Sequence, residues 1–259
     1  MRLGLMQGRL LPPVGGHIQE FPKNWKDEFA LLNECGLDSV EWLLTKGSIS
    51  FNPALRDPQS VVGYPISSIC VDTLVDEGIH DSEYLRETLE PLCRLISEHP
   101  FVKTITIPLL EESSMEDGFK RKKFLGCMVQ IAQLYPNINF SFEAELGIKE
   151  LDEIVSLCDN FYVTYDTGNI TSYGLDHAEY ISTFSKKINN VHLKDRTFGA
   201  RTVEPTQGDT DFKQIFKNLK TINYDGPYIL QTARSIDGRE KDTILRHKKI
   251  FEDLYAEAI

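Results

Sequence analysis

The sequence predicts an α/β protein, a single (β/α)8 TIM barrel that spans residues 1–259. Short apolar runs alternate with longer amphipathic stretches eight times along the chain. The runs begin about 25 to 40 residues apart, which is the repeat expected of a strand, a loop and a returning helix. No tract rich in Pro, Gly or Ser divides the chain, so the eight repeats are expected to form one domain.

The apolar runs resemble strands of a parallel sheet that is buried on both faces. They are short, and most are rich in β-branched or aromatic residues. The expected strands are residues 3–7, 39–43, 66–72, 102–107, 138–143, 161–166, 189–194 and 228–232.

The stretches between the strands carry apolar residues at helical spacing. The expected helices are residues 25–35, 82–97, 117–135, 149–158, 176–186, 211–220 and 237–255. Residues 51–62 contain Pro53 and Pro58, so the second repeat is expected to hold only a short helix. Asp211 or Thr210 is placed to cap the helix of the seventh repeat.

An open, doubly wound sheet is the alternative architecture. Such sheets commonly carry Gly-x-Gly-x-x-Gly after the first strand, where the glycines let the backbone approach a dinucleotide. The first strand here leads into Gln7-Gly8-Arg9 instead, and the chain has no Walker-type phosphate loop. The sequence therefore favours the barrel and predicts no nucleotide cofactor.

Composition narrows the class of partner. The formal net charge of −11 opposes an extended surface that neutralises nucleic-acid phosphates. No run approaches the roughly 20 apolar residues of a membrane-spanning helix, and the N-terminal run is broken too early for a signal peptide. The five cysteines are scattered without a Cys-x-x-Cys pair. We therefore expect a soluble, reduced, cytoplasmic protein that binds neither nucleic acid nor membrane.

Four expected strands in the second half of the chain end on a residue that can bind a divalent metal. These residues are Glu143, Asp166, His192 and Gln231. The C-terminal ends of barrel strands meet at the face where active sites lie. Three oxygen donors and one imidazole suit Mn²⁺, Mg²⁺, Co²⁺ or Zn²⁺ in an open site. The pattern predicts a catalytic divalent metal held by these four side chains.

Each predicted ligand also has a structural interpretation. Asp166 precedes Thr167-Gly168-Asn169, so its side chain could form an Asx turn. An isolated His on an apolar strand, such as His192, is often a hydrogen-bonded core residue. Gln231 could be a hydrogen-bonding support residue rather than a ligand. The joint pattern, rather than any single residue, favours the metal site.

Several motifs give the chain a resemblance to a known family. They are Phe142-Glu143, Tyr165-Asp166-Thr167-Gly168-Asn169, Val191-His192-Leu193-Lys194-Asp195 and Gly208-Asp209-Thr210-Asp211-Phe212. Over nearly its whole length the chain resembles the xylose-isomerase-like barrels, which include sugar phosphate isomerases and epimerases. The resemblance implies that a Glu, an Asp, a His and a second Glu hold the metal, and that the two Glu side chains move protons. It also implies a homo-oligomer, because members are often dimers or tetramers.

The chain departs from this pattern at Gln231, which stands where the family has its second Glu. An amide oxygen can coordinate a metal, but it does not accept a proton at neutral pH. Epimerisation normally needs two proton-transfer groups, whereas an aldose–ketose isomerisation can use one base through an enediolate. We therefore predict a metal-dependent isomerase of a small sugar or sugar phosphate, with Glu143 and Lys194 as catalytic residues.

Other functions on the same site stay open. A sugar 3-epimerase remains possible if a neighbour such as Glu145, Asp195 or Lys194 supplies the second proton transfer, and a sugar dehydratase could use the same enolate. A non-catalytic sugar-binding barrel is the alternative from a different class. An endonuclease-like hydrolase resembles the three-zinc version of this barrel, which needs more His ligands, and few of the six His residues here lie at strand ends.

A further set of polar residues near the strand ends is expected to bind the substrate. Arginines there could meet a phosphate or carboxylate, although a solvated surface charge is the plainer interpretation. Lys194 could equally form a structural ion pair with an acidic neighbour. The predicted substrate-binding residues are Glu41, Asp72, Asn169, Asp195, Arg196, Arg201 and Arg234.

Overall fold

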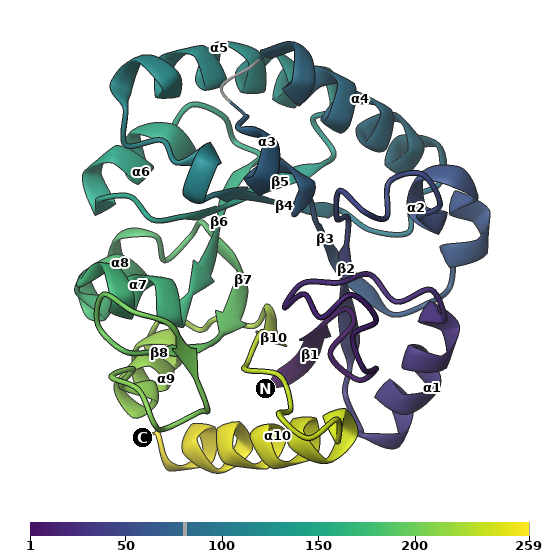
Figure 1. Cartoon of the computed structure of the whole chain (residues 1–259). Coiled ribbons are helices and arrows are strands. Elements are labelled where there is room, and N and C mark those ends of the chain that lie inside the picture. The colour runs from purple at the N-terminus through teal and green to yellow at the C-terminus, as the bar shows by residue number, and fades with distance from the viewer. Residues whose placement is uncertain (80–81, 259) are drawn as a thin grey trace. The chain divides into compact units, whose positions relative to one another are not determined.

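Eight parallel strands form the sheet in a computed structural model that describes residues 1–79 and 82–258. The strands are β1 (Arg2–Met6), β2 (Ser39–Leu43), β3 (Ile66–Cys70), β4 (Thr104–Leu109), β5 (Asn139–Ala144), β6 (Phe161–Asp166), β7 (Ile188–Leu193) and β10 (Pro227–Leu230). They close into a barrel in the order β1-β10-β7-β6-β5-β4-β3-β2 (Figure 1). The predicted fold class is confirmed.

Helices follow the strands in the predicted alternation. They are α1 (Trp25–Glu34), α2 (Pro53–Arg56), α3 (Thr73–Glu77), α4 (Ser82–Glu98), α5 (Gly118–Leu134), α6 (Ile148–Val155), α7 (Thr167–Tyr173), α8 (His177–Thr183), α9 (Phe212–Thr221) and α10 (Glu240–Glu257). Two short 3₁₀ turns, η1 (Pro58–Val61) and η2 (Glu111–Ser113), complete the set. The Asp211 side chain accepts a hydrogen bond from the Gln214 N–H at 3.1 Å, so the predicted cap of α9 is present.

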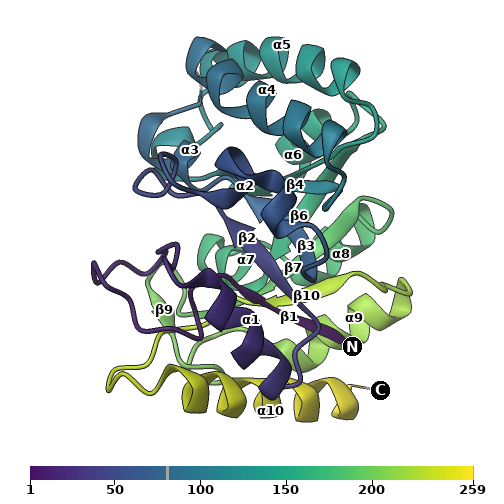
Figure 2. The same ribbon diagram turned by 90° about the vertical axis from the view of Figure 1, so that its right-hand side faces the viewer.

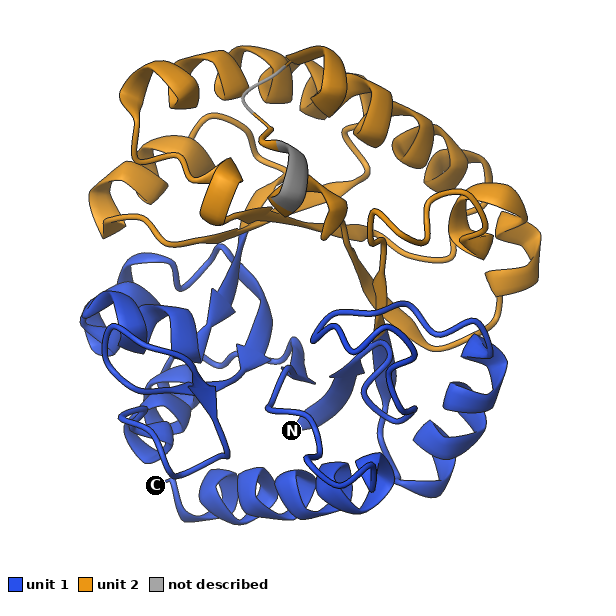
Figure 3. Cartoon of the chain, viewed as in Figure 1, with its two compact units in different colours: residues 1–40, 163–259 blue, residues 41–162 orange. Residues whose placement is uncertain are grey.

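The chain divides into two compact units, which are coloured separately in Figure 3. Unit 1 comprises residues 1–40 and 163–259, and unit 2 comprises residues 41–162. Unit 1 is therefore built from both terminal parts of the chain. The expectation that all 259 residues form one domain stays a prediction.

Aromatic packing joins helices to strands within unit 1. Helix α10 packs against α9 and β10, as Figures 1 and 2 show. The rings of Phe216 on α9 and Tyr228 on β10 lie 6.0 Å apart between centroids, and the ring of Phe251 on α10 lies 4.9 Å from that of Phe212. These buried edge-to-face contacts fix α9 and α10 behind β10.

In unit 2 the same kind of contact holds α5 against β5. The ring of Phe142 on β5 lies 5.9 Å from that of Phe124 on α5 and 5.0 Å from that of Phe161. Strand β5 pairs in parallel with β4, so that Glu143 is opposite Pro108. This packing and register hold the end of β5, and with it Glu143.

Strand register brings two predicted ligands together in unit 1. The ladder between β6 and β7 sets Asp166 opposite His192, after an irregularity between Val163 and Thr164. His192 in turn is opposite Ile229 of β10. Neighbouring strands of a sheet lie about 4.8 Å apart, so directly opposite side chains on the same face are in reach of one another.

Several short elements were not predicted from the sequence. Helix α3 begins at Thr73, shortly after β3 ends at Cys70, and α7 begins at Thr167, directly after β6. A small antiparallel ribbon of β8 (Asp195–Arg196) and β9 (Thr202–Val203) lies in the connection after β7. Within the described residues, no helix is both long and apolar enough to cross a membrane.

Candidate metal and substrate site

Asp166 is the last residue of β6, and its two carboxylate oxygens contact different groups. Its Oδ1 accepts a hydrogen bond from the Asn169 N–H at 2.8 Å, which caps the start of α7. Its Oδ2 lies 2.8 Å from the Nζ of Lys194. The turn-forming interpretation of Asp166 is therefore correct for one oxygen, while the other oxygen pairs with a cation.

His192 lies on β7 and is fully buried. Its Nδ1 is 3.8 Å from the Oδ2 of Asp166, and its Nε2 is 3.3 Å from the Nδ2 of Asn190. A distance of 3.8 Å is too long for a good hydrogen bond. Imidazole nitrogen and carboxylate oxygen are both donor atoms that suit a divalent cation.

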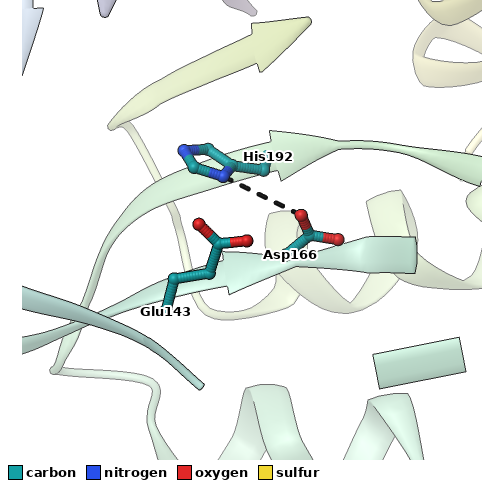
Figure 4. A group of neighbouring side chains, drawn as sticks. All are labelled: Glu143, Asp166 and His192. Atoms are coloured by element: carbon teal, nitrogen blue, oxygen red, sulfur yellow. Dashed lines mark ion pairs between the residues drawn. The ribbon is translucent and has the colours of Figure 1, made fainter. Parts of the chain in front are cut away.

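Glu143 on β5 completes a group of three buried residues that could hold a metal ion. One ligand atom from each of Glu143, Asp166 and His192 lies within 4.8 Å of the others. Figure 4 shows the two carboxylates and the imidazole ring gathered at the ends of their strands. Two carboxylates and one imidazole are a donor set that suits Zn²⁺, Mn²⁺ or Co²⁺.

Gln231 follows β10 directly and is 6% exposed. Its backbone N–H donates to the Leu193 carbonyl at 3.2 Å, which continues the ladder between β10 and β7 by one residue. Its buried Oε1 accepts no hydrogen bond from any described residue. A buried acceptor without a donor is costly, and a cation would satisfy it. Ligation by Gln231 stays a prediction.

Lys194 pairs with Asp166, as the structural interpretation of the sequence allowed. Its backbone is anchored to α7, because Thr167 Oγ1 donates to its carbonyl at 2.7 Å and accepts from its N–H at 3.0 Å. A Cβ at Gly168 would lie 2.9 Å from the Lys194 Cγ. Glycine at 168 therefore lets α7 approach the Lys194 side chain closely.

Two predicted substrate-binding residues bond to each other. Arg196 Nη1 donates to Asn169 Oδ1 at 2.9 Å, and its Nε donates to the Ala200 carbonyl at 2.8 Å. The guanidinium thus joins α7 to the loop between β8 and β9. Substrate contact by Arg196 and Asn169 stays a prediction.

Asp195 is fully buried and holds the loop that precedes α9. Its Oδ2 accepts from the Gly208 N–H at 2.9 Å, and its Oδ1 accepts from the Thr210 N–H at 3.3 Å. A Cβ at Gly208 would lie 2.2 Å from the Asp195 Oδ1, so this close approach requires glycine. The contacts give Asp195 a loop-anchoring role, and its predicted contact with substrate stays a prediction.

The remaining predicted residues lie in different settings. Glu41 on β2 is fully buried and accepts a hydrogen bond from Thr106 Oγ1 at 2.5 Å. Asp72 is half-buried where α3 begins. Arg201 is exposed. Arg234 donates to the backbone carbonyls of the first loop, at 2.8 Å to that of Gly8.

Glu28 and Arg234 both form hydrogen bonds with the loop between β1 and α1, which we call the first loop. Both carboxylate oxygens of Glu28 accept from the Gly8 N–H, at 2.8 and 2.9 Å, and Arg234 Nε donates to the Ile18 carbonyl at 3.0 Å. Burial raises the pKa of Glu28 to about 7. The N–H groups of Gly8 and Leu10 and the charges of Arg234 and Arg9 act in the opposite direction and are outweighed. The role of Glu28 was not predicted from the sequence, because an acidic residue on a helix is usually solvated.

Four further polar residues, which lie near the end of β10, were also not predicted from the sequence. They are Arg9, Glu204, Thr232 and His247, and hydrogen bonds join them. Thr232 adjoins Gln231, which was the one available signal in the sequence. His247 lies at the middle of α10, where helical spacing alone indicates only a buried position.

Comparisons with known proteins agree with the fold and with the motifs. The sequence profile of the family described as xylose isomerase-like TIM barrel matches residues 137–251. An inosose dehydratase of Clostridium perfringens is 33% identical over 106 residues, which cover 33% of this chain and 35% of that relative. The alignment thus spans about a third of the length of that relative.

Two comparisons extend over most or all of the chain. A Haemophilus influenzae protein with the provisional name L-ribulose-5-phosphate 3-epimerase SgbU is 22% identical over 252 residues, covering 84% of this chain and 87% of that protein. The solved structure of the IolI protein with a bound zinc atom has a TM-score of 0.76 at 17% identity, covering 100% of this chain and 99% of that one. The resemblance is therefore confirmed: residues 137–251, which include all four predicted ligands, match the sequence profile of the xylose isomerase-like TIM barrels, and the whole chain shares its fold with the IolI protein.

Proposed function

We propose that this protein is a divalent-metal-dependent isomerase that moves a proton beside the carbonyl group of a small sugar or sugar phosphate. The observation that carries the proposal is the grouping of Glu143, Asp166 and His192, whose ligand atoms lie within 4.8 Å of one another. The same three residues supply an acid–base group within a buried setting. Similarity to sugar epimerases and inosose dehydratases supports this class of substrate.

The residues fit a divalent cation of the Mn²⁺, Co²⁺, Mg²⁺ or Zn²⁺ type. Glu143, Asp166 and His192 would hold it, and the buried Gln231 Oε1 is the fourth candidate donor. A bound cation would polarise a substrate carbonyl and stabilise the negative charge that develops on its oxygen. An amide in place of a carboxylate at 231 leaves one negative charge fewer around that cation.

Proton transfer falls to the chain itself. In the isomerase reaction Glu143 takes the proton from the hydroxyl-bearing carbon beside the carbonyl and returns it to the former carbonyl carbon on the same face. The proton of that hydroxyl passes to the former carbonyl oxygen, so that a new carbonyl and a new hydroxyl form. Lys194 donates a hydrogen bond to a substrate oxygen and so compensates its growing charge. The ion pair with Asp166 directs the Lys194 ammonium group towards the predicted ligands. One carboxylate base is sufficient for this reaction.

A dehydratase is the second candidate, favoured by the similarity to inosose dehydratases over residues of this barrel. Glu143 would again remove the proton beside the carbonyl. The adjacent carbon–hydroxyl bond would then break, with Lys194 donating a proton so that the hydroxyl leaves as water. The two candidates share the first step and differ in the product.

The test incubates the purified protein with Mn²⁺ or Co²⁺ in deuterated water and a panel of sugars, sugar phosphates and inososes. Mass spectrometry distinguishes an isomer, which has the mass of its substrate apart from deuterium, from a product that has lost one water. We expect isomerisation, and a Glu143→Gln variant with turnover lower by about 10²- to 10⁴-fold. Glu153→Gln, on the exposed part of α6, is the matched control and should retain activity.

The outcomes separate the candidates. Loss of water would replace the isomerase proposal with the dehydratase. Binding of a sugar without deuterium exchange or water loss would favour a non-catalytic sugar-binding barrel. Full activity in Glu143→Gln would remove Glu143 from the proposed chemistry.

A further inference from the structure

A chain of buried hydrogen bonds lies behind the end of β10, within unit 1. Thr232 Oγ1 is 2.8 Å from the Nδ1 of His247 on α10, and the Nε2 of His247 is 2.7 Å from the Oε2 of Glu204. Thr232 and His247 are both fully buried. We call Thr232, His247 and Glu204, together with Arg9, the β10 bracket.

The direction of these hydrogen bonds follows from the chemistry of the partners. Glu204 has two cationic or polar donors, His247 and Arg246, and their hydrogen bonds outweigh partial burial and lower its pKa. Burial lowers the pKa of His247, and the charges of Arg246 and Arg9 lower it further. Glu204 raises this pKa but does not outweigh them, so the ring is neutral at pH 7. The ionised Glu204 can only accept, which requires His247 Nε2 to carry the hydrogen. His247 Nδ1 therefore accepts from the Thr232 hydroxyl.

The backbone of the same segment is held from another direction. Arg9 Nη1 donates to the Thr232 carbonyl at 2.8 Å, and Arg9 Nη2 donates to Gln19 Oε1 at 3.0 Å. One residue earlier, the Gln231 N–H donates to the Leu193 carbonyl at 3.2 Å. The main chain on both sides of the Gln231 side chain is thus fixed by side chains and strands of unit 1.

The Gln231 side chain contrasts with this fixed backbone. Its Oε1 is buried and has no hydrogen-bond donor among the described residues. Successive side chains of an extended segment leave on opposite sides. Because the Thr232 hydroxyl meets α10, Gln231 is directed away from α10. The hydrogen bonds described around Gln231 therefore act on its backbone and on residue 232.

We propose that Thr232 and His247 are positioning residues, which fix the backbone of residues 231 and 232 so that the Gln231 amide oxygen is presented to the metal. This inference rests on the proposed function, because it assumes that a cation binds at the ends of β6 and β7. Glu204 orients the His247 ring, in the way that outer partners orient metal ligands in other sites. None of the three residues touches substrate in this proposal.

The test measures Co²⁺ affinity by visible absorption in the purified full-length chain, independently of turnover. Thr232→Val keeps the volume of the side chain and removes its hydroxyl, whereas Thr232→Ser keeps the hydroxyl. We expect Thr232→Val to weaken Co²⁺ binding about tenfold, the lower end of the range for outer partners of a metal ligand. Thr232→Ser should bind Co²⁺ as the wild type does. Lys249→Gln, on the exposed face of α10 where Lys249 pairs with Asp253, is the control and should leave the affinity unchanged.

A double-mutant cycle separates positioning from a general loss of stability. Gln231→Ala should weaken Co²⁺ binding, and Thr232→Val should add nothing further once Gln231 is absent. Additive effects of the two changes would overturn the proposal, as would wild-type affinity in Thr232→Val. A second pair of variants compares a polar with an apolar side chain at the same buried position. His247→Asn retains a polar group near Thr232 and should bind Co²⁺ more tightly than His247→Phe.

The result also distinguishes this inference from the proposed function. If the wild type binds no stoichiometric Co²⁺, the metal site itself is wrong and the inference fails with it. If the wild type and Lys249→Gln bind Co²⁺ equally and Thr232→Val matches them, the metal site stands and only the positioning role is overturned.

Discussion

Two strand ends in unit 1 present their predicted ligands in different ways. Asp166, at the end of β6, carries a negative charge and has Lys194 at 2.8 Å and His192 at 3.8 Å from its Oδ2. Gln231, after β10, is neutral, and the groups that hold it contact the backbone and the adjacent Thr232. The first end is organised by charges around the ligand, the second by hydrogen bonds behind it. Removing a ligand should therefore have unequal effects at the two ends.

The largest expected effect tests this inequality directly. Asp166→Ala should abolish stoichiometric Co²⁺ and Mn²⁺ binding, because it removes a charged donor and leaves the partly buried Lys194 without its counter-charge. Gln231→Ala should weaken binding without abolishing it, since it removes a neutral donor. Elemental analysis after equilibration with limiting metal measures both. Equal losses in the two variants would contradict the distinction between the strand ends.

Lys194 gives a second, smaller test at the β6 end. Its ammonium group lies at the Asp166 oxygen that a cation would use, so metal and Lys194 compete there. Lys194→Met should bind Co²⁺ several-fold more tightly while turnover falls by about a hundredfold or more. Lys249→Met, on the exposed face of α10, is the control and should change neither quantity. Weaker Co²⁺ binding in Lys194→Met would show that Lys194 supports the metal site rather than competing with the cation.

The smallest expected effect concerns the loop beside the β10 end, which Glu28 and Arg234 hold. The pKa of Glu28 is raised from 4.5 to about 7 by burial, so the folded protein binds this proton more tightly than the unfolded chain does. The stability that this protonated group contributes is complete below about pH 4.5 and is lost as the pH rises through 7. The loss amounts to about 3 kcal/mol at most, at about 1.4 kcal/mol for each pKa unit.

Urea unfolding at pH 5 and pH 8 measures this effect. Relative to the wild type, Glu28→Gln should gain stability between the two pH values, because the variant has no group at 28 that ionises. Glu34→Gln, at the exposed end of the same helix, should follow the pH dependence of the wild type. A constant difference between wild type and Glu28→Gln at both pH values would mean that the Glu28 carboxyl is already ionised at pH 5.

The sequence predicted the strand ends well because burial and charge leave a local pattern. Glu143, Asp166 and His192 each stand at the end of an apolar run, and parallel strands bring such ends together. Strand β2 has its predicted bounds, whereas β7 begins one residue early. Helix α7 was not predicted because Thr167-Gly168-Asn169 resembles a turn, although Asp166 itself supplies the cap that starts the helix.

The β10 bracket could not be predicted for a different reason. His247 and Thr232 are 15 residues apart, and Glu204 is 43 residues from His247, so only the folded chain brings them together. Arg234 also has contacts with residues that are distant in the sequence. It was predicted to bind substrate because it follows a strand, which stays a prediction, and the sequence did not indicate that its guanidinium donates to the carbonyl of Gly8, 226 residues away. A charge near a strand end does not reveal from sequence whether it faces ligand or backbone.

The pairing of β1 with β10 also has a consequence for how the protein is made. Residues 2–5 hydrogen-bond with residues 227–230, and Arg9 reaches Thr232 across 223 residues of sequence. At about 5 to 20 residues per second, the ribosome needs roughly 10 to 45 seconds to complete that interval. Throughout this time one edge of β1 waits without its strand partner, a period in which a nascent chain is open to aggregation. The β1 edge therefore gains its β10 partner only when nearly the whole sequence has been synthesised.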